Sequence, residues 1–192
     1  MFRSAAHADL RRTPRQPYRT RRRAGLTLTE TLVTLSIGLV ALGAAVPGFE
    51  GARERRHVEG AAALFETDFA YARSSAVATN QTLRLRFGGD ATGSCYVVFA
   101  GSPTQCTCSA AGPVCSGGIE PLRHVHQAAD SGVAIEANVA TLSLDPLRGT
   151  VTPTATVRFT ARDGRALHQV VNLMGRVRSC SPAAALPGYP RC

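Results

Sequence analysis

The chain has 192 residues, a length that allows one domain plus a tail or anchor but not two full domains. Hydrophobic residues make up 44% and aromatic residues only 6%, so we exclude wholesale disorder and expect a core of mainly aliphatic side chains. The net charge of +9 is concentrated at the start: residues 1–25 hold eight Arg and one acid, whereas residues 26–192 carry only +2. A uniformly basic nucleic-acid-binding surface is thereby excluded for residues 26–192.

The first predicted element is an apolar helix that follows the basic segment 1–25. Residues 31–49 carry no charge, and these nineteen residues of helix span about 28 Å, close to the hydrocarbon thickness of a bilayer. We therefore predict a transmembrane segment over 26–52. By the positive-inside rule, the arginines before it place the N-terminus in the cytoplasm, so we expect the remainder of the chain to be translocated.

A single acid, Glu30, lies near the start of this apolar segment. A carboxylate in a membrane helix costs roughly 2.5–3.5 kcal/mol, and less near the interface. Glu30 is therefore either a snorkelling interfacial acid or a charge that requires a cationic partner. An alternative for the whole region is an ordinary or twin-arginine signal peptide cleaved near Ala45, but an acid within the apolar run argues against it.

The residues around Glu30 resemble the processing signal of type IV prepilins and type II secretion pseudopilins. The segment Arg22-Arg23-Ala24-Gly25-Leu26 precedes the acid, and Pro47 follows it seventeen residues later. The resemblance implies that a prepilin peptidase cleaves after Gly25 and methylates Leu26, where the family usually has Phe. It also implies that Glu30 pairs with the N-terminal amine of a neighbouring subunit during filament assembly, and it makes Pro47 a family hallmark.

Residues 53–79 are predicted to continue as an amphipathic helix, after a junction that Pro47 kinks or loosens. Apolar residues recur there at intervals of three and four, which defines one face for packing against a core. This face consists of Val58, Ala62, Phe65, Phe69, Ala72 and Ala76. We expect the helix to end near Thr79-Asn80.

From residue 80 the pattern has a period of two, which is typical of strands with one exposed face. The expected strands cover 82–87, 95–100, 122–127, 133–137, 141–144, 156–161, 166–173 and 176–180, with a loop over 101–118. Asp163-Gly164 between two alternating runs predicts a tight hairpin. The predicted fold class is α+β: a long N-terminal helix, membrane half plus amphipathic half, followed by a small, mostly antiparallel β domain over 80–192.

The β domain and the end of the helix resemble H-type pseudopilins and FimT-type minor pilins. The similar segments are Ala72-Arg73-Ser74-Ser75-Ala76 and Gly175-Arg176-Val177-Arg178. The resemblance implies a pilin-like fold. It also implies three partners: other pilins or pseudopilins through the N-terminal helix, the prepilin peptidase and the inner-membrane assembly platform.

The cysteines all lie in the translocated part of the chain, at Cys95, Cys106, Cys108, Cys115, Cys180 and Cys192. An even number in an oxidising compartment predicts disulfides. We expect Cys180–Cys192 to pin the C-terminal tail and the other four to cross-link the region 95–115. The alternative is a metal site of Cys106, Cys108 and Cys115 with His124 or His126, but this spacing is not a standard zinc pattern. We expect neither a metal nor a cofactor.

No phosphate-binding loop, zinc-protease motif or serine-hydrolase motif is present, so the sequence predicts that the chain is not an enzyme. Its one predicted binding feature is a cluster of arginines around a single acid, Asp163: Arg158, Arg162, Arg165, Arg176 and Arg178. Such segregated charge is typical of an anion site, because guanidinium groups hold phosphates bidentately. The alternatives are a solvated strand face or contacts with neighbouring subunits.

Arg176 and Arg178 are two residues apart and project from the same face of a predicted strand, while Gly175 permits a positive φ or a close backbone approach. In FimT-type minor pilins a Gly-Arg-x-Arg motif at this place is implicated in DNA binding during natural transformation. The resemblance implies that Gly175, Arg176 and Arg178 contact duplex DNA.

The expected function is that of a minor pilin or pseudopilin in a type II secretion pseudopilus or type IV pilus, serving protein export. The chain would be single-pass in the inner membrane, with its C-terminal domain in the periplasm. The alternative function is capture of duplex DNA during natural transformation.

Overall fold

The fold begins with a long helix, α1 (Leu28–Thr79). The computed structural model describes residues 25–109, 111–182 and 186–192, without the side chains of 45–48. The predicted end of this helix is confirmed. Asn80 has a left-handed φ of 50°, and the amides of Asn80 and Gln81 donate to the carbonyls of Val77 and Ala76. This pair of bonds is the Schellman motif, which satisfies carbonyls that the last turn leaves free.

The chain divides into two compact units, one ending at Gly43 and the other covering Ala44–Cys192. No single helix of the described residues is long and apolar enough to cross a membrane, whereas the α1 segments Leu28–Ala44 and Phe49–Thr79 together meet that requirement as a broken span. The membrane anchor expected over 26–52 stays a prediction.

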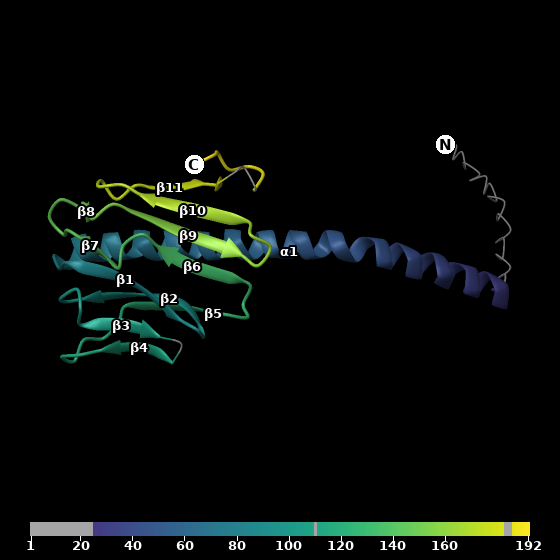
Figure 1. Cartoon of the computed structure of the whole chain (residues 1–192), viewed down its shortest axis with the longest axis horizontal. Helices are drawn as coiled ribbons and strands as arrows, with labels where there is room; N and C mark the ends of the chain where they lie inside the picture. Colours follow the sequence, from purple (N-terminus) through teal and green to yellow (C-terminus); the bar gives the residue numbers. More distant parts are fainter. Residues whose placement is uncertain (1–24, 110, 183–185) are drawn as a thin grey trace, which may run out of the picture. The chain divides into compact units, whose positions relative to one another are not determined.

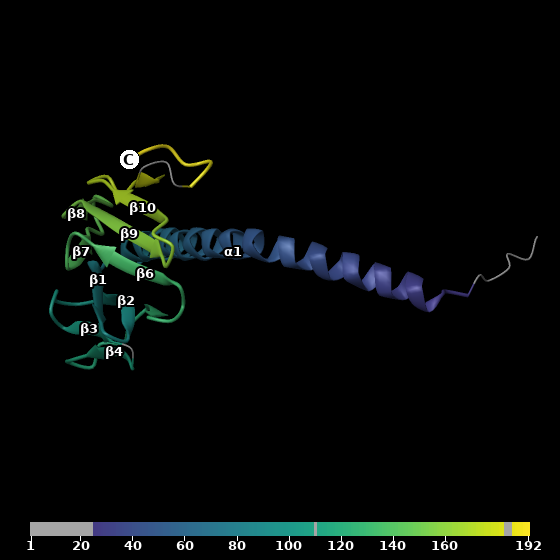
Figure 2. The ribbon, with the colours of Figure 1, turned by 45° about the vertical axis from the view of Figure 1, so that its right-hand side comes forward.

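The second unit contains two large antiparallel sheets gathered over the C-terminal part of α1, besides a two-stranded one described below (Figures 1 and 2). The first has the order β5-β2-β1-β7-β8, built from β5 (Arg123–Ala128), β2 (Gly93–Ala100), β1 (Leu83–Asp90), β7 (Thr141–Leu144) and β8 (Val151–Thr152). The second has the order β11-β10-β9-β6, built from β11 (Val177–Cys180), β10 (Ala166–Val171), β9 (Ala155–Ala161) and β6 (Val133–Ala137). The α+β class with a mostly antiparallel β domain is confirmed.

The core lies between α1 and both sheets. All six residues of the predicted apolar face of α1 are at most 2% exposed, which confirms that interpretation of their spacing. Phe65 joins the three layers, since its ring lies 5.6 Å from that of Tyr96 in β2 and 5.8 Å from that of Phe159 in β9. Burial of such aromatic side chains supplies a large share of the stabilisation of a small core.

The expected loop over 101–118 was wrong, because it contains a hairpin of β3 (Cys106–Ser109) and β4 (Gly112–Cys115). This hairpin lies on the far side of the first sheet from the second sheet (Figures 1 and 2). There Val97, Phe99 and Cys106 form a small separate core. Four-residue strands rich in Gly, Ser, Pro and Cys carry no hydrophobic period, so pattern alone does not reveal them. The strand β8 was also missed, because its two residues are too few to show a period.

Candidate interaction surfaces

The start of α1 holds the residues predicted to act in processing and assembly. The amide of Glu30 donates to the hydroxyl of Thr27 at 3.3 Å, so Thr27 caps the helix and Glu30 occupies its first turn. Thr27 and Glu30 have the spacing of a capping box, and an acid there is favoured by the helix dipole. Gly25 and Leu26 precede the helix and are exposed. Pro47 lies within α1, but its side chain is outside the described residues.

Two of the predicted arginines share the outer face of the second sheet. Arg158 in β9 lies opposite His168 in β10, and Arg178 in β11 lies opposite Val170, the next outward residue of β10. Two strand spacings and two residues separate these arginines, which places their Cα atoms about 12 Å apart. Arg176, directly before β11, is also exposed, and its amide donates to the Asn172 side chain at 2.9 Å.

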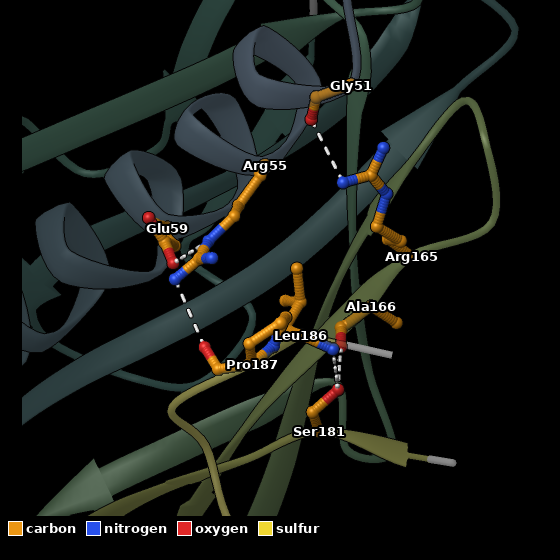
Figure 3. Close-up of polar contacts among 8 residues, drawn as sticks. All are labelled: Gly51, Arg55, Glu59, Arg165, Ala166, Ser181, Leu186 and Pro187. Atoms are coloured by element: carbon orange, nitrogen blue, oxygen red, sulfur yellow. Dashed lines mark hydrogen bonds and ion pairs between the residues drawn. The ribbon is translucent and has the colours of Figure 1, made fainter. Parts of the chain in front are cut away.

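The other two arginines lie elsewhere, which corrects the expectation of one local patch. Arg162 and Arg165 flank the β9–β10 turn, and the six residues of β10 separate that turn from Arg176 by about 20 Å. Arg162 donates to the Asp130 carbonyl. Arg165 pairs with Asp163 at 2.6 Å. It also donates to the carbonyl of Gly51 in α1 at 2.9 Å, as Figure 3 shows. Consecutive hairpin turns lie at opposite ends of a sheet, so closeness in sequence did not predict closeness in space.

His168 lies between Arg158 and Cys180 on the outer face. Its partial burial, followed by the positive charge of Arg158, lowers the pKa of the imidazole. His168 is therefore protonated less readily than a free imidazole, and the arginines supply most of the positive charge of this face. Glu136 in β6 lies opposite Arg158 and brings one acid to the same row.

The structure contains three disulfides: Cys180–Cys192, which is the pair expected to pin the tail, and Cys95–Cys108 and Cys106–Cys115 within the region 95–115. The cysteines of the alternative metal site are thus oxidised and offer no thiolate to zinc. Within the described ranges, the one group of three close metal-type ligands is His168, Cys180 and Cys192. Its two sulfur atoms are bonded to each other.

Gly175 shows both features that the sequence allowed. Its φ is 69°, and a Cβ at this position would lie 2.9 Å from Nε of Arg73. Arg73 projects from α1, and its Nε donates to the carbonyl of Gly149 at 3.1 Å. Arg73 thereby joins α1 to the turns that contain Gly149 and Gly175. No sequence signal indicated this role beyond the resemblance of segment 72–76.

A second unpredicted group ties α1 to the first sheet. Tyr96 in β2 donates its hydroxyl hydrogen bond to the carboxylate of Asp68 in α1 at 2.8 Å, and both residues are buried. Burial, together with this carboxylate, raises the pKa of Tyr96 above its ordinary value. Arg123 lies 3.7 Å from Asp68 and stacks 4.2 Å above the ring of Tyr71. These partners lie far apart in the sequence, at 68–71, 96 and 123, so no local sequence pattern could have predicted the group.

A helix with exposed apolar residues at its start, followed by antiparallel sheets packed on its end, defines a pilin-like subunit. The family model for the type II transport protein GspH matches residues 61–175, and the chain belongs to that family. Its members are structural subunits and not enzymes. No curated protein matches the sequence.

The similar solved structures include those of two bacterial proteins. The type IV minor pilin FimU of Pseudomonas aeruginosa is 20% identical, with a TM-score of 0.49 over 69% of this chain and 98% of that chain. The minor pseudopilin EpsH of the Vibrio cholerae type 2 secretion system is 12% identical, with a TM-score of 0.47 over 66% of this chain and 98% of that one.

Proposed function

We propose that the chain is a minor subunit of a type II secretion pseudopilus or a type IV pilus. In this proposal 1–25 is the leader, 26–52 anchors the chain in the inner membrane, and 53–79 and 80–192 form the periplasmic part. The observation that carries the proposal is the contrast along α1. Large apolar side chains from Leu28 to Leu42 are more than half exposed, whereas the apolar face from Val58 onward is buried. The exposed part requires lipid or other helices as its surroundings.

Glu30 supplies the electrostatic part of assembly in this proposal. It is exposed beside the apolar side chains of α1, and no ion pair to it is found among the described residues. A charge in these surroundings is costly unless it is paired. The amine of a processed neighbouring subunit is a cation at the same depth in the membrane.

Replacement of Glu30 tests the assembly role. We expect Glu30→Ala to reduce incorporation into the sheared filament fraction by about tenfold, because a loss near 1.4 kcal/mol changes an equilibrium by that factor. Glu50→Ala is the matched control, since Glu50 is also exposed on α1 but lies after the apolar segment. Normal incorporation and export with Glu30→Ala would contradict the proposal.

The processing step is tested by the mass and N-terminal sequence of the mature protein. The proposal predicts an N-terminus at Leu26 that carries one methyl group. A mature protein that starts just after Ala45 would support the signal-peptide alternative instead.

DNA capture is a second candidate, favoured by the exposure of Arg158, Arg176 and Arg178 on one side of the second sheet. If these three arginines contact phosphates, the logarithm of the binding constant should fall with the logarithm of salt concentration with a slope of about −2.7. The measurement is a gel-shift titration of the full chain with duplex DNA. Arg176→Ala/Arg178→Ala should abolish binding and Arg162→Ala should not; a slope near zero would contradict this function.

A further inference from the structure

The edge of the second sheet at β11 is open over part of its length. β11 ends the strand order, so one side of it lacks a neighbouring strand. The amide of Asn172 donates to the carbonyl of Arg176, which identifies Arg176 and Arg178 as residues whose main chains bond β10. The main-chain groups of Val177 and Ser179 therefore point away from β10, and no partner for their amides is found in the described part of the chain.

The chain itself shows that an extended segment fits beside β11. At the far end of the strand, the amide of Ser181 points outward and donates to the carbonyl of Pro190 in the tail at 2.9 Å. The tail also bridges to α1, since Arg55 donates to the carbonyl of Pro187 at 3.1 Å (Figure 3). Leu186 of the tail is only 1% exposed and belongs to the main core. The tail therefore closes the space between β11 and α1 at this end.

At the Val177 end the described residues leave the same space unfilled. A groove of about 550 Å³ runs between α1 and the start of β11. Its apolar lining comes from Phe69, Ala70, Val77, Ala78 and Val177, and its polar lining from Glu66, Arg73 and Ser74. Val77 is 53% exposed although it lines the same groove as the buried Phe69. The groove thus has an apolar wall on α1 and unpaired main-chain groups on β11.

The charge beside the groove indicates the kind of segment that fits. Arg176 and Arg178 are exposed on the outer face of the open edge, and Arg73 lines the groove. A strand added to β11 places alternate side chains in the groove and on the outer face. Its inward residues would contact apolar side chains, and its outward residues would lie beside the two arginines, where acids are favoured.

We propose that the β11 groove, defined by Val77, Gly175, Val177 and the open edge of β11, binds an extended segment of a neighbouring filament subunit as an added strand. The segment is apolar towards α1 and acidic on the outer face. Main-chain hydrogen bonds supply affinity in this mode of recognition, and the alternating side chains supply specificity. This inference rests on the proposed function, because it takes its partner from the filament.

The experiment uses a fluorescent, end-capped seven-residue peptide of alternating valine and glutamate, titrated against the full chain in detergent micelles by fluorescence anisotropy. We expect saturable binding that weakens at least about tenfold in Val177→Pro, since proline removes an outward amide but keeps the bonds to β10. Val177→Ala retains the amide and should weaken binding less than about threefold. Ala137→Pro is the matched control, because it removes an outward amide from β6 at the opposite edge.

Two further peptides keep the test decisive if Val177→Pro fails to fold. One carries lysine in place of glutamate, and the other is N-methylated at alternate amides. Both should bind the unaltered chain at least about tenfold more weakly. Equal binding of either peptide, or no binding of the glutamate peptide, would overturn the proposal. If the chain enters filaments in a Glu30-dependent manner but does not bind the glutamate peptide, the groove proposal is wrong while the proposed function stands.

Discussion

At the scale of single residues, contacts between distant positions hold the helix on the sheets. Arg73 reaches from α1 to the carbonyl of Gly149 and lies against Gly175, so a single guanidinium group connects three segments. Asp68 and Tyr96 make the corresponding buried connection to the first sheet. The net contribution of one such hydrogen bond to stability is about 1 kcal/mol, but a buried partner left unpaired costs more than that. These residues therefore fix the position of α1 more than they add to total stability.

Gly175→Ala tests the contact with Arg73. We expect a loss of about 2–3 kcal/mol in the free energy of unfolding, since alanine at positive φ costs about 1 kcal/mol and its methyl group displaces Arg73 from Gly149. The matched control is Gly164→Ala, whose φ is 82° but whose Cβ would meet nothing within 4 Å. Urea unfolding of both variants gives the comparison. Equal losses in the two variants would show that Arg73 contributes nothing to the effect.

At the scale of elements, β5 carries two histidines on one face. His124 and His126 are on the face of β5 that pairs with Val97 and Cys95, and their Nε2 atoms are buried without a hydrogen-bond partner among the described residues. Burial, followed by the nearby charge of His126, lowers the pKa of His124. The unfolded chain therefore binds a proton at His124 more readily than the folded chain does.

This difference predicts acid lability. The contribution of His124 to stability is complete above its ordinary pKa of about 6.5 and is lost as the pH falls below that value, by at most about 1.4 kcal/mol per pH unit. His124→Gln should make the decline of unfolding free energy between pH 7 and pH 5 shallower than in the unaltered chain. The measurement is urea unfolding across this range, with pH 8 as the reference condition. An unchanged slope would contradict the prediction.

The elements also show how far sequence patterns reach. The 3–4 spacing from Val58 to Ala76 predicted the buried face of α1, and Asp163-Gly164 predicted the β9–β10 turn, because both signals are local. The β3–β4 hairpin was missed because no periodic pattern marks it. Two disulfides hold it in place, and its Cys106 packs with Phe99 of β2. Arg158 and Arg165 were grouped wrongly because the direction of successive strands, which sets their separation, is a property of the folded sheet.

At the scale of the whole molecule, buried and exposed apolar residues are divided by position along the chain. The buried hydrophobic residues of the described chain all lie between Val58 and Leu186. The large apolar residues from Leu26 to Leu42 are exposed, and residues up to Gly43 form a unit separate from Ala44–Cys192. The first unit thus carries exposed apolar surface, which in the proposed function contacts lipid or other helices, while the second unit contains the core and the open edge of β11.

This division predicts that the second unit folds without the first. A chain limited to 44–192 should unfold cooperatively in urea at the same midpoint as the full chain in detergent, because its core loses no buried residue. It should also stay soluble without detergent, whereas the full chain should aggregate through its exposed apolar segment. A lower midpoint or a gradual transition would show that residues before 44 contribute to the core. Unfolding followed by circular dichroism, with sedimentation for aggregation, distinguishes these outcomes.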